Sequence, residues 1–194
     1  MSTLPTFDTP ELRDLETLIR ERRTVGMYLP TPVPDTLIKR AIDISVWAPN
    51  HHVTEPWRFY LMGDTTRAAA AELVRDIVTE RRGPEAGEFK AKAWSKIPGM
   101  LTVTCQRSPD SELREREDYA ACSAMLQNFA LYLWRAGLGT KWTTGPITRD
   151  ARFFEMIGAN ETEESVVGLI FYGYPKITPE QQRAPLADLL VELP

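Results

Sequence analysis

The segment 118–136 constrains the fold most, because it is the longest stretch of apolar or small residues in the chain and Gly137 follows it as a stop signal. A helix that is apolar over most of its circumference must be covered on most sides. In a chain of 194 residues, either the core of a monomer or a second subunit can supply that cover. Small side chains would let another helix approach closely, and here they are Ala120, Ala121, Ser123 and Ala124. We expect a central helix and, as one source of its cover, a second copy of the chain.

The remaining segments predict helices and short strands that do not alternate regularly. Apolar residues at helical spacing, with breaks at Gly and Pro, predict helices at 12–23, 36–47, 65–82, 85–96 and 149–157. Apolar and β-branched runs predict strands at 59–62, 101–105, 141–144 and 165–172. Asp35 is expected to cap the second helix. Without a regular strand-helix-strand order, the fold class is α+β rather than a doubly wound sheet.

Length and composition indicate one globular domain over residues 1–194, with residues 1–11 as a loosely ordered N-terminal extension. A hydrophobic fraction of 43% and a charged fraction of 26% are ordinary for such a domain. The net charge of −4 argues against a nucleic-acid partner. No leader pattern and no run of ~18–20 apolar residues occurs, so we expect a cytoplasmic protein without a membrane span. Cys105 and Cys122 are expected to be buried free thiols rather than a disulfide or a metal pair.

Two polar segments in the first third of the chain point to a ligand. Arg22 and Arg23 fall on the last turn of the first predicted helix, where cations also suit the helix dipole without any ligand, and Thr24 follows them. The segment 48–59 is rich in polar residues, contains the adjacent histidines 51 and 52, and joins a predicted helix to a predicted strand. Ligand contacts tend to be placed in such loops. Together, the cations and the loop favour an anion-anchored cofactor site.

These segments resemble the motifs of the nitroreductase family of flavin mononucleotide (FMN) enzymes. The similarity covers about residues 12–190 and rests on four segments in the family's order, namely Arg22-Arg23-Thr24, Ala48-Pro49 to Pro56-Trp57, Gly137 to Trp142, and Val167 to Pro175. Val53 and Glu55 stand where the family has Asn and Gln, and the loop offers instead Asn50, His51 and His52. The chain is therefore similar to the compact, His-containing branch of the family.

The resemblance implies a central, mostly antiparallel sheet flanked by helices, in an intertwined homodimer with FMN at the subunit interface. It also implies the FMN contacts, which are Arg22, Arg23, Thr24, His51, Trp142, Thr143, Thr144 and Arg183. Guanidinium and hydroxyl groups suit a phosphate, and a histidine can donate to the cofactor, in this family often from the opposite subunit. His52 competes with His51 for that role, and an ordinary buried strand is the alternative for residues 142–144.

The function that the resemblance implies is transfer of a hydride from NAD(P)H through FMN N5 to an electron-poor acceptor, a nitroaromatic or a quinone, by a ping-pong mechanism. No side chain is nominated as catalytic, because in a flavoenzyme the cofactor performs the redox chemistry. A metal site is not expected, since two adjacent histidines chelate poorly. Three alternatives stay open: a different redox reaction on the same fold, a non-catalytic FMN-binding protein, and a cofactor-free interaction module.

Overall fold

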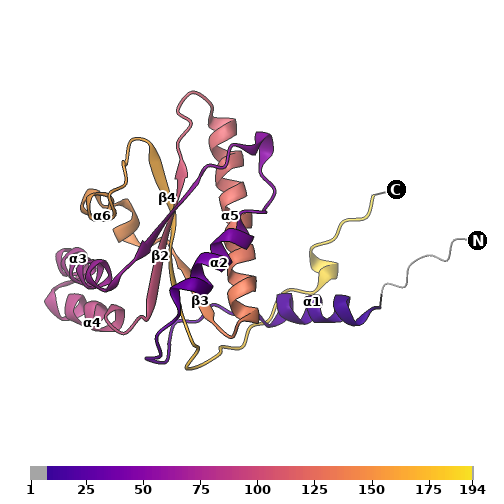
Figure 1. The fold of residues 1–194 in the computed structure, drawn as a ribbon, viewed down its shortest axis with the longest axis horizontal. Coiled ribbons are helices and arrows are strands. Elements are labelled where there is room, and N and C mark those ends of the chain that lie inside the picture. Colours follow the sequence, from indigo (N-terminus) through magenta and orange to yellow (C-terminus); the bar gives the residue numbers. More distant parts are fainter. Residues whose placement is uncertain (1–7, 194) are drawn as a thin grey trace, which may run out of the picture.

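The computed structural model describes residues 8–193 and shows an α+β fold (Figure 1). A four-stranded sheet has the order β1-β2-β4-β3, and every neighbouring pair is antiparallel. The strands are β1 (Trp57–Met62), β2 (Gly99–Gln106), β3 (Gly139–Thr143) and β4 (Glu164–Gly173). The helices are α1 (Pro10–Glu21), α2 (Asp35–Ser45), α3 (Asp64–Arg82), α4 (Pro84–Trp94), α5 (Glu112–Arg135) and α6 (Ala151–Ile157). Short 3₁₀ turns are η1 (His51–Val53), η2 (Pro146–Arg149) and η3 (Leu186–Asp188).

Helices cover both faces of the sheet, which explains why its central strands are apolar along most of their length. Figure 1 shows α2 and α5 on one face and α3, α4 and α6 on the other. Along β2, Leu101 and Val103 belong to the core cluster shared with α5, whereas Met100 belongs to the cluster shared with α3. A strand that is buried on both faces reads as a continuous apolar run instead of an alternating pattern.

α5 is longer than its apolar pattern indicates, because its first turns are polar. It begins at Glu112 rather than at residue 118, and Ser111 caps it by accepting a hydrogen bond from the N–H of Arg114 at 3.3 Å. Gly137 follows the helix with a φ of 82°, as suits a helix stop. Within one chain, the sheet and α2 cover the inner side of α5, where side chains such as Phe129 are buried.

α1 and the segment 176–193 project from the body of the molecule and carry exposed apolar side chains (Figure 1). No residue of α1 is buried, and Leu15 and Ile19 are 48% and 51% exposed. In the C-terminal segment, Leu189 and Val191 are 71% and 78% exposed. We call α1 and the segment 176–193 the apolar arms. Exposed apolar surface of this kind favours packing against another molecule. The apolar arms agree with the intertwined homodimer, which stays a prediction.

The end of α1 and the start of α2 differ from the sequence-based expectations. α1 ends at Glu21, so Arg22 and Arg23 follow the helix instead of lying on its last turn. The predicted capping by Asp35 is wrong, since Pro34 occupies the cap and Asp35 is the first helical residue. Pro34 offers the following N–H groups no side-chain acceptor, and the Asp35 carboxylate instead lies in the first turn, where the helix dipole favours negative charge.

The expected N-terminal extension falls partly within the described residues. Of the expected loose extension 1–11, residues 1–7 lie outside the described part, while Thr9 caps α1 and residues 10–11 begin it. The single-domain organisation stays a prediction. Cys105 and Cys122 are free and buried, as predicted. None of the helices between residues 8 and 193 is long and apolar enough to cross a bilayer.

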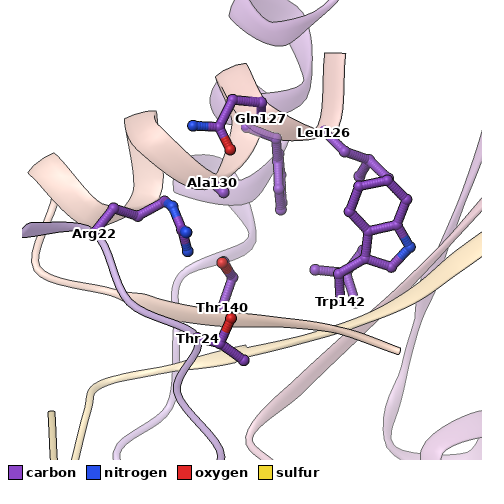
Figure 2. A pocket seen from close by; sticks show the side chains of 9 residues that line it. Arg22, Thr24, Leu126, Gln127, Ala130, Thr140 and Trp142 are labelled. Carbon is purple, nitrogen blue, oxygen red and sulfur yellow. The ribbon is translucent and has the colours of Figure 1, made fainter. Parts of the chain in front are cut away.

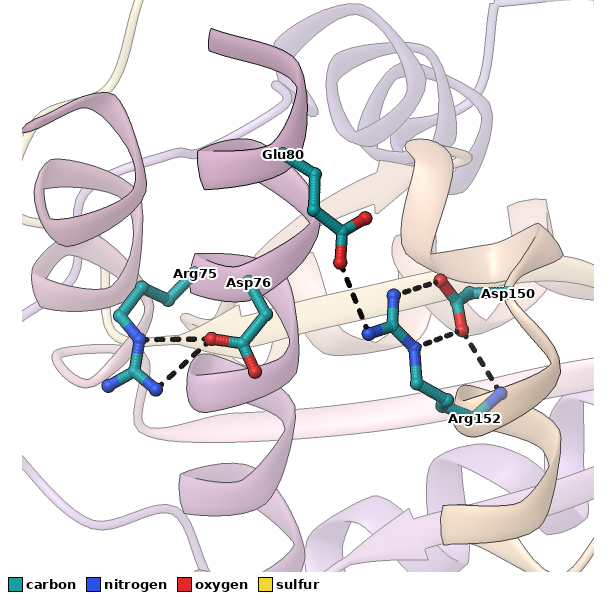
Figure 3. A network of polar contacts seen from close by, with 5 residues as sticks. All are labelled: Arg75, Asp76, Glu80, Asp150 and Arg152. Carbon is teal, nitrogen blue, oxygen red and sulfur yellow. Dashed lines mark hydrogen bonds and ion pairs between the residues drawn. The ribbon is translucent and has the colours of Figure 1, made fainter. Parts of the chain in front are cut away.

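Polar contacts attach α6 to α3 (Figure 3). Arg152 in the first turn of α6 pairs with Asp150 at 2.7 Å and with Glu80 of α3 at 3.5 Å. The Asp150 carboxylate also accepts a hydrogen bond from the backbone N–H of Arg152 and so caps the helix. Its hydrogen bonds with Arg152 hold the pKa of Asp150 below the ordinary value. The cap explains why α6 begins at Ala151 and not at residue 149.

Candidate functional site

The segment that follows α1 joins the edge of the sheet and places Thr24 beside β3. Thr24 forms a parallel bridge with Thr140, and the N–H of Val25 donates to the Thr140 carbonyl oxygen at 2.9 Å. Val25 is buried against Gly139. A Cβ on Gly139 would lie 2.4 Å from Cγ2 of Val25, so a side chain there would prevent this approach. The glycine motif of the sequence thus brings Thr24 and Thr140 together.

A cavity of about 120 Å³, which we call the α5 cavity, opens between this sheet edge and α5 (Figure 2). The residues that line it include Arg22, Thr24, Gln127, Ala130, Thr140 and Trp142. Figure 2 shows the guanidinium of Arg22 and the hydroxyls of Thr24 and Thr140 around the same space. Polar donors opposite an apolar helix surface suit a ligand that has both polar and apolar parts.

Trp142 forms a fixed wall of the α5 cavity. Its indole Nε1 donates to the carbonyl oxygen of Val167 on β4 at 2.9 Å. The ring packs on Gly168, where a Cβ would lie 2.2 Å from the indole nitrogen. Trp142 nevertheless stays 41% exposed, so part of its surface is free to contact a ligand.

Arg22, Arg23 and Arg183 gather where the C-terminal segment passes the segment after α1. The cavity of about 80 Å³ that they line, together with Thr24 and Glu180, is the arginine cavity. Burial lowers the pKa of Arg22, and the charges of Arg183 and Arg23 lower it further. Within residues 8–193, the buried Nε of Arg22 has no hydrogen-bond partner. Concentrated positive charge and a free buried donor are the chemistry of an anion site.

His51 lies away from both cavities of its own chain. Its Nδ1 is 3.1 Å from Oε2 of Glu117 on α5, and its ring stacks on His52 with 3.9 Å between the ring centroids. It lines a separate, open cavity with Glu117 and Ala120. The described chain does not bring His51 to Arg22, so a role for His51 at the predicted cofactor would require a second subunit.

The loop 50–55, which carries His51, has a costly backbone conformation. His52, Val53 and Glu55 have positive φ angles of 59°, 52° and 45°. Each such residue costs of order 1–3 kcal/mol, and such residues cluster at ligand-binding and active sites. A side chain supports the turn from within, since Oδ1 of Asn50 accepts a hydrogen bond from the N–H of Glu55 at 2.7 Å. The strain is an independent indication that the loop serves a site.

Thr143 and Thr144 line neither the α5 cavity nor the arginine cavity. Their assignment as contacts stays a prediction, as do those of the other residues named from the sequence. The α5 cavity also contains residues that sequence reasoning missed, namely Gln127, Ala130 and Thr140. Thr140 could have been found from the glycine motif that contains it, and Gln127 as a polar residue within an apolar helix. Nothing in the sequence singles out Ala130.

Comparisons with known proteins support the resemblance. The sequence model of the nitroreductase family matches residues 19–174 of the chain. The Bacillus subtilis (strain 168) protein "Putative NAD(P)H nitroreductase YfhC" is 31% identical over 184 residues, which cover 92% of this chain and 94% of that protein.

Two solved structures have the same fold. A nitroreductase-like family protein from Bacillus cereus is 27% identical with a TM-score of 0.81, covering 98% of this chain and 99% of that one. A "putative nitroreductase in complex with fmn" from Desulfovibrio desulfuricans is 23% identical with a TM-score of 0.75, covering 96% of this chain and 98% of that one. With the antiparallel sheet, these similarities confirm the predicted fold class.

Proposed function

Because the chain belongs to the nitroreductase family, we propose that it is an FMN-dependent oxidoreductase that takes its reducing equivalents from NAD(P)H. The observation that carries the proposal is that Arg22, Arg23 and Arg183 line one cavity. In addition, the buried Nε of Arg22 has no hydrogen-bond partner within residues 8–193. A phosphate dianion would offset the repulsion among these cations and accept a hydrogen bond from Nε. The similarity to YfhC, which is described as a putative NAD(P)H nitroreductase, and to the Desulfovibrio protein, which was solved with FMN, supports the same assignment.

The residues present fit this cofactor by the chemistry of their donors. Arg22 and Arg183 would bind the phosphate, and Arg23 would add positive charge. The hydroxyls of Thr24 and Thr140 would donate to the ribityl chain, with the fixed indole of Trp142 as a wall for the ring. Bound FMN would supply the redox chemistry, which is to accept a hydride at N5 from NAD(P)H and pass it to an electron-poor acceptor such as a nitroaromatic or a quinone. Donor and acceptor would occupy the same space in turn, which predicts ping-pong kinetics.

A homodimer is part of the proposal, because the two cavities that the predicted contacts line within one chain are too small for the cofactor. The α5 and arginine cavities measure about 120 and 80 Å³, whereas ligand pockets usually measure about 300–1,000 Å³. A second copy would close the site and cover the exposed apolar side chains of α1 and of segment 176–193. It could also bring its own His51, which lines neither of these two cavities within its own chain.

The experiment that tests the function is a visible absorbance spectrum of the purified protein, followed by FMN titration of Arg22→Ala. We expect bound flavin in the wild type and an FMN dissociation constant raised about 10- to 100-fold in the variant, since hydrogen bonds to charged groups contribute about 1.5–3 kcal/mol. Arg40→Ala, on the exposed side of α2, is the matched control. Unchanged affinity in Arg22→Ala would remove Arg22 from the site.

Steady-state assays separate catalysis from storage of the cofactor. The proposal predicts oxidation of NAD(P)H, in the presence of a quinone, well above the rate of free FMN at the same concentration. Parallel lines in double-reciprocal plots would support the ping-pong order. A protein that binds FMN without accelerating this reaction would be a sequestering protein instead.

A further inference from the structure

Two neighbouring carboxylates of α5 hold the strained loop 50–55 against the helix. Oγ1 of Thr54 donates a hydrogen bond to Oδ1 of Asp118 at 2.5 Å. One residue earlier on the helix, Oε2 of Glu117 lies 3.1 Å from Nδ1 of His51. The loop therefore has two separate side-chain attachments to α5.

The two attachments differ in their surroundings. Asp118 is only 4% exposed, so its contact with Thr54 belongs to the interior of the fold. The side chains of Glu117 and His51 are 35% and 61% exposed, and both line an open cavity of about 480 Å³. Contacts between side chains at such exposed positions add little to stability. The buried pair can therefore hold the loop by itself, and the exposed pair is available for another role.

The contact with Glu117 determines which nitrogen of His51 carries the proton. An ionised carboxylate can only accept a hydrogen bond, so Nδ1 donates, and the neutral imidazole then presents Nε2 as an acceptor. The ring of His52 stacks on that of His51, with 3.9 Å between the centroids and 20° between the planes. One contact at the edge of the imidazole and one on its face fix its orientation.

The oriented Nε2 has no use within its own chain. Among residues 8–193, the hydrogen bond with Glu117 is the only one that the His51 side chain makes. Ala120 and Ala124 line the same open cavity, and their short side chains leave room for another molecule. Strained backbone of the kind found in this loop clusters at ligand-binding sites. A fixed acceptor in a strained, open loop favours a ligand that reaches it from outside the chain.

We propose that Glu117 is a positioning residue of the flavin site, which holds His51 so that Nε2 accepts a hydrogen bond from FMN bound to the partner subunit. The inference rests on the proposed function and its homodimer. An acceptor nitrogen suits the hydrogen-bond donors of FMN, which are the ribityl hydroxyls and the ring N3–H, and does not suit the phosphate. His51 would therefore contact the riboflavin part of the cofactor, whereas the arginines would bind its phosphate.

A double-mutant cycle, measured by FMN titration, tests whether Glu117 acts through His51. His51→Ala should raise the dissociation constant about 3- to 10-fold, as expected for one hydrogen bond between neutral groups. Glu117→Ala should raise it about 2- to 5-fold, and the double variant should equal His51→Ala alone. Unchanged affinity in Glu117→Ala, or losses that multiply in the double variant, would overturn the proposal. Glu112→Ala, on the same helix, is the matched control.

Riboflavin and a conservative variant test the nature of the contact. Because the predicted hydrogen bond avoids the phosphate, Glu117→Ala should weaken riboflavin and FMN by the same factor. Glu117→Gln keeps an oxygen that can accept from Nδ1, so it should bind FMN within about twofold of the wild type. A loss confined to FMN, or a loss in Glu117→Gln as large as in Glu117→Ala, would contradict the proposal. Melting temperatures and light scattering verify that the variants remain folded dimers.

Mixed dimers test whether His51 acts across the subunit interface. One chain carries Arg22→Ala and the other carries Glu117→Ala, with different affinity tags for purification. If His51 reaches the partner's site, one site of each mixed dimer carries both substitutions and the other carries neither, so one site should bind FMN with wild-type affinity. If both sites are weakened, His51 acts within its own chain and the proposal fails.

Failure of this inference is distinguishable from failure of the proposed function. A wild type that binds no flavin would contradict both. A wild type that binds FMN, together with unchanged affinity in Glu117→Ala and a loss in Arg22→Ala, would contradict only the role of Glu117.

Discussion

The Arg22 guanidinium lies beside two other cations, Arg23 and Arg183, and burial adds to the cost of its charge. An arrangement of this kind reduces the stability of the chain by itself, because like charges repel and a buried donor without a partner forfeits a hydrogen bond. A bound phosphate would reverse both effects. We therefore infer that the three arginines lower the stability of the ligand-free protein and, in return, raise its affinity for an anion.

Arg183→Ala tests this exchange directly. Without FMN, the variant should melt at the wild-type temperature or slightly above it, because one repulsive charge is gone. With FMN at about 100 times its dissociation constant, the wild type should gain about 2.7 kcal/mol, or about 5–10 °C. A tenfold loss of affinity in the variant would about halve that gain. Thermal scans with and without FMN measure both, and equal gains would contradict a role for Arg183 in binding.

At the scale of single elements, α6 depends on one carboxylate at its start. Asp150 caps the helix and bonds Arg152, which reaches α3 through Glu80 (Figure 3). Because Arg152 lowers the pKa of Asp150 from its ordinary value of 3.8, the stabilisation is fully present above that value and is lost as the pH falls below it.

Asp150→Asn keeps a side chain that can cap a helix and removes only the charge. We expect a loss of about 0.5–1 kcal/mol in the free energy of unfolding at neutral pH, since the pair is partly exposed. The difference from the wild type should shrink toward zero well below the ordinary pKa of an aspartate. Urea unfolding at neutral and acid pH gives both values. A difference that is independent of pH would show that the charge contributes nothing.

Gly139 holds the site together at the edge of the sheet, because its missing side chain lets Val25 pack against β3. Gly139→Ala would place a Cβ 2.4 Å from Cγ2 of Val25. We expect it to displace segment 24–25, to cost about 1–3 kcal/mol of stability and to weaken FMN binding. Gly145→Ala is the matched control, since its Cβ would make only an ordinary contact at 3.8 Å. Wild-type stability and FMN affinity in Gly139→Ala would contradict this account of the site.

The hydrophobic pattern of the sequence predicted most of the helices and strands, and the predictions that failed did so for physical reasons. Apolar spacing identified the centre of α5 but not its polar start, which depends on a cap at Ser111. The expected cap at Asp35 failed because a carboxylate can serve equally well one residue inside a helix, in the first turn. Local motifs predicted Arg22 and Thr24, which line the α5 cavity, whereas Ala130 lines it only because α5 packs across the sheet edge. Tertiary packing of that kind leaves no local signal.

At the scale of the whole molecule, the exposed apolar arms are the main feature that one chain leaves unexplained. α1 has no buried residue, and the side chains of Leu189 and Val191 are largely exposed. The distance of His51 from Arg22 poses the same problem at the site. A homodimer would answer both, since each arm could pack on the partner and each His51 loop could reach the partner's site.

Light scattering during size-exclusion chromatography measures the predicted assembly. The wild type should have twice the chain mass of 22.0 kDa. A double variant in which Leu189 and Val191 are each replaced by Glu should shift the protein toward the monomer and release FMN, because charges would replace apolar contacts. The control is Glu192→Gln in the same segment. A wild-type mass of one chain would contradict the dimer.

The central claim is that guanidinium groups hold the phosphate of a flavin, and the most direct measurement is the ratio of the dissociation constants of riboflavin and FMN. The two ligands differ only in the phosphate. We expect the wild type to bind FMN at least about 100-fold more tightly, and the ratio to fall toward one in the double variant Arg22→Ala, Arg183→Ala. Equal affinity of the wild type for riboflavin and FMN would contradict the account.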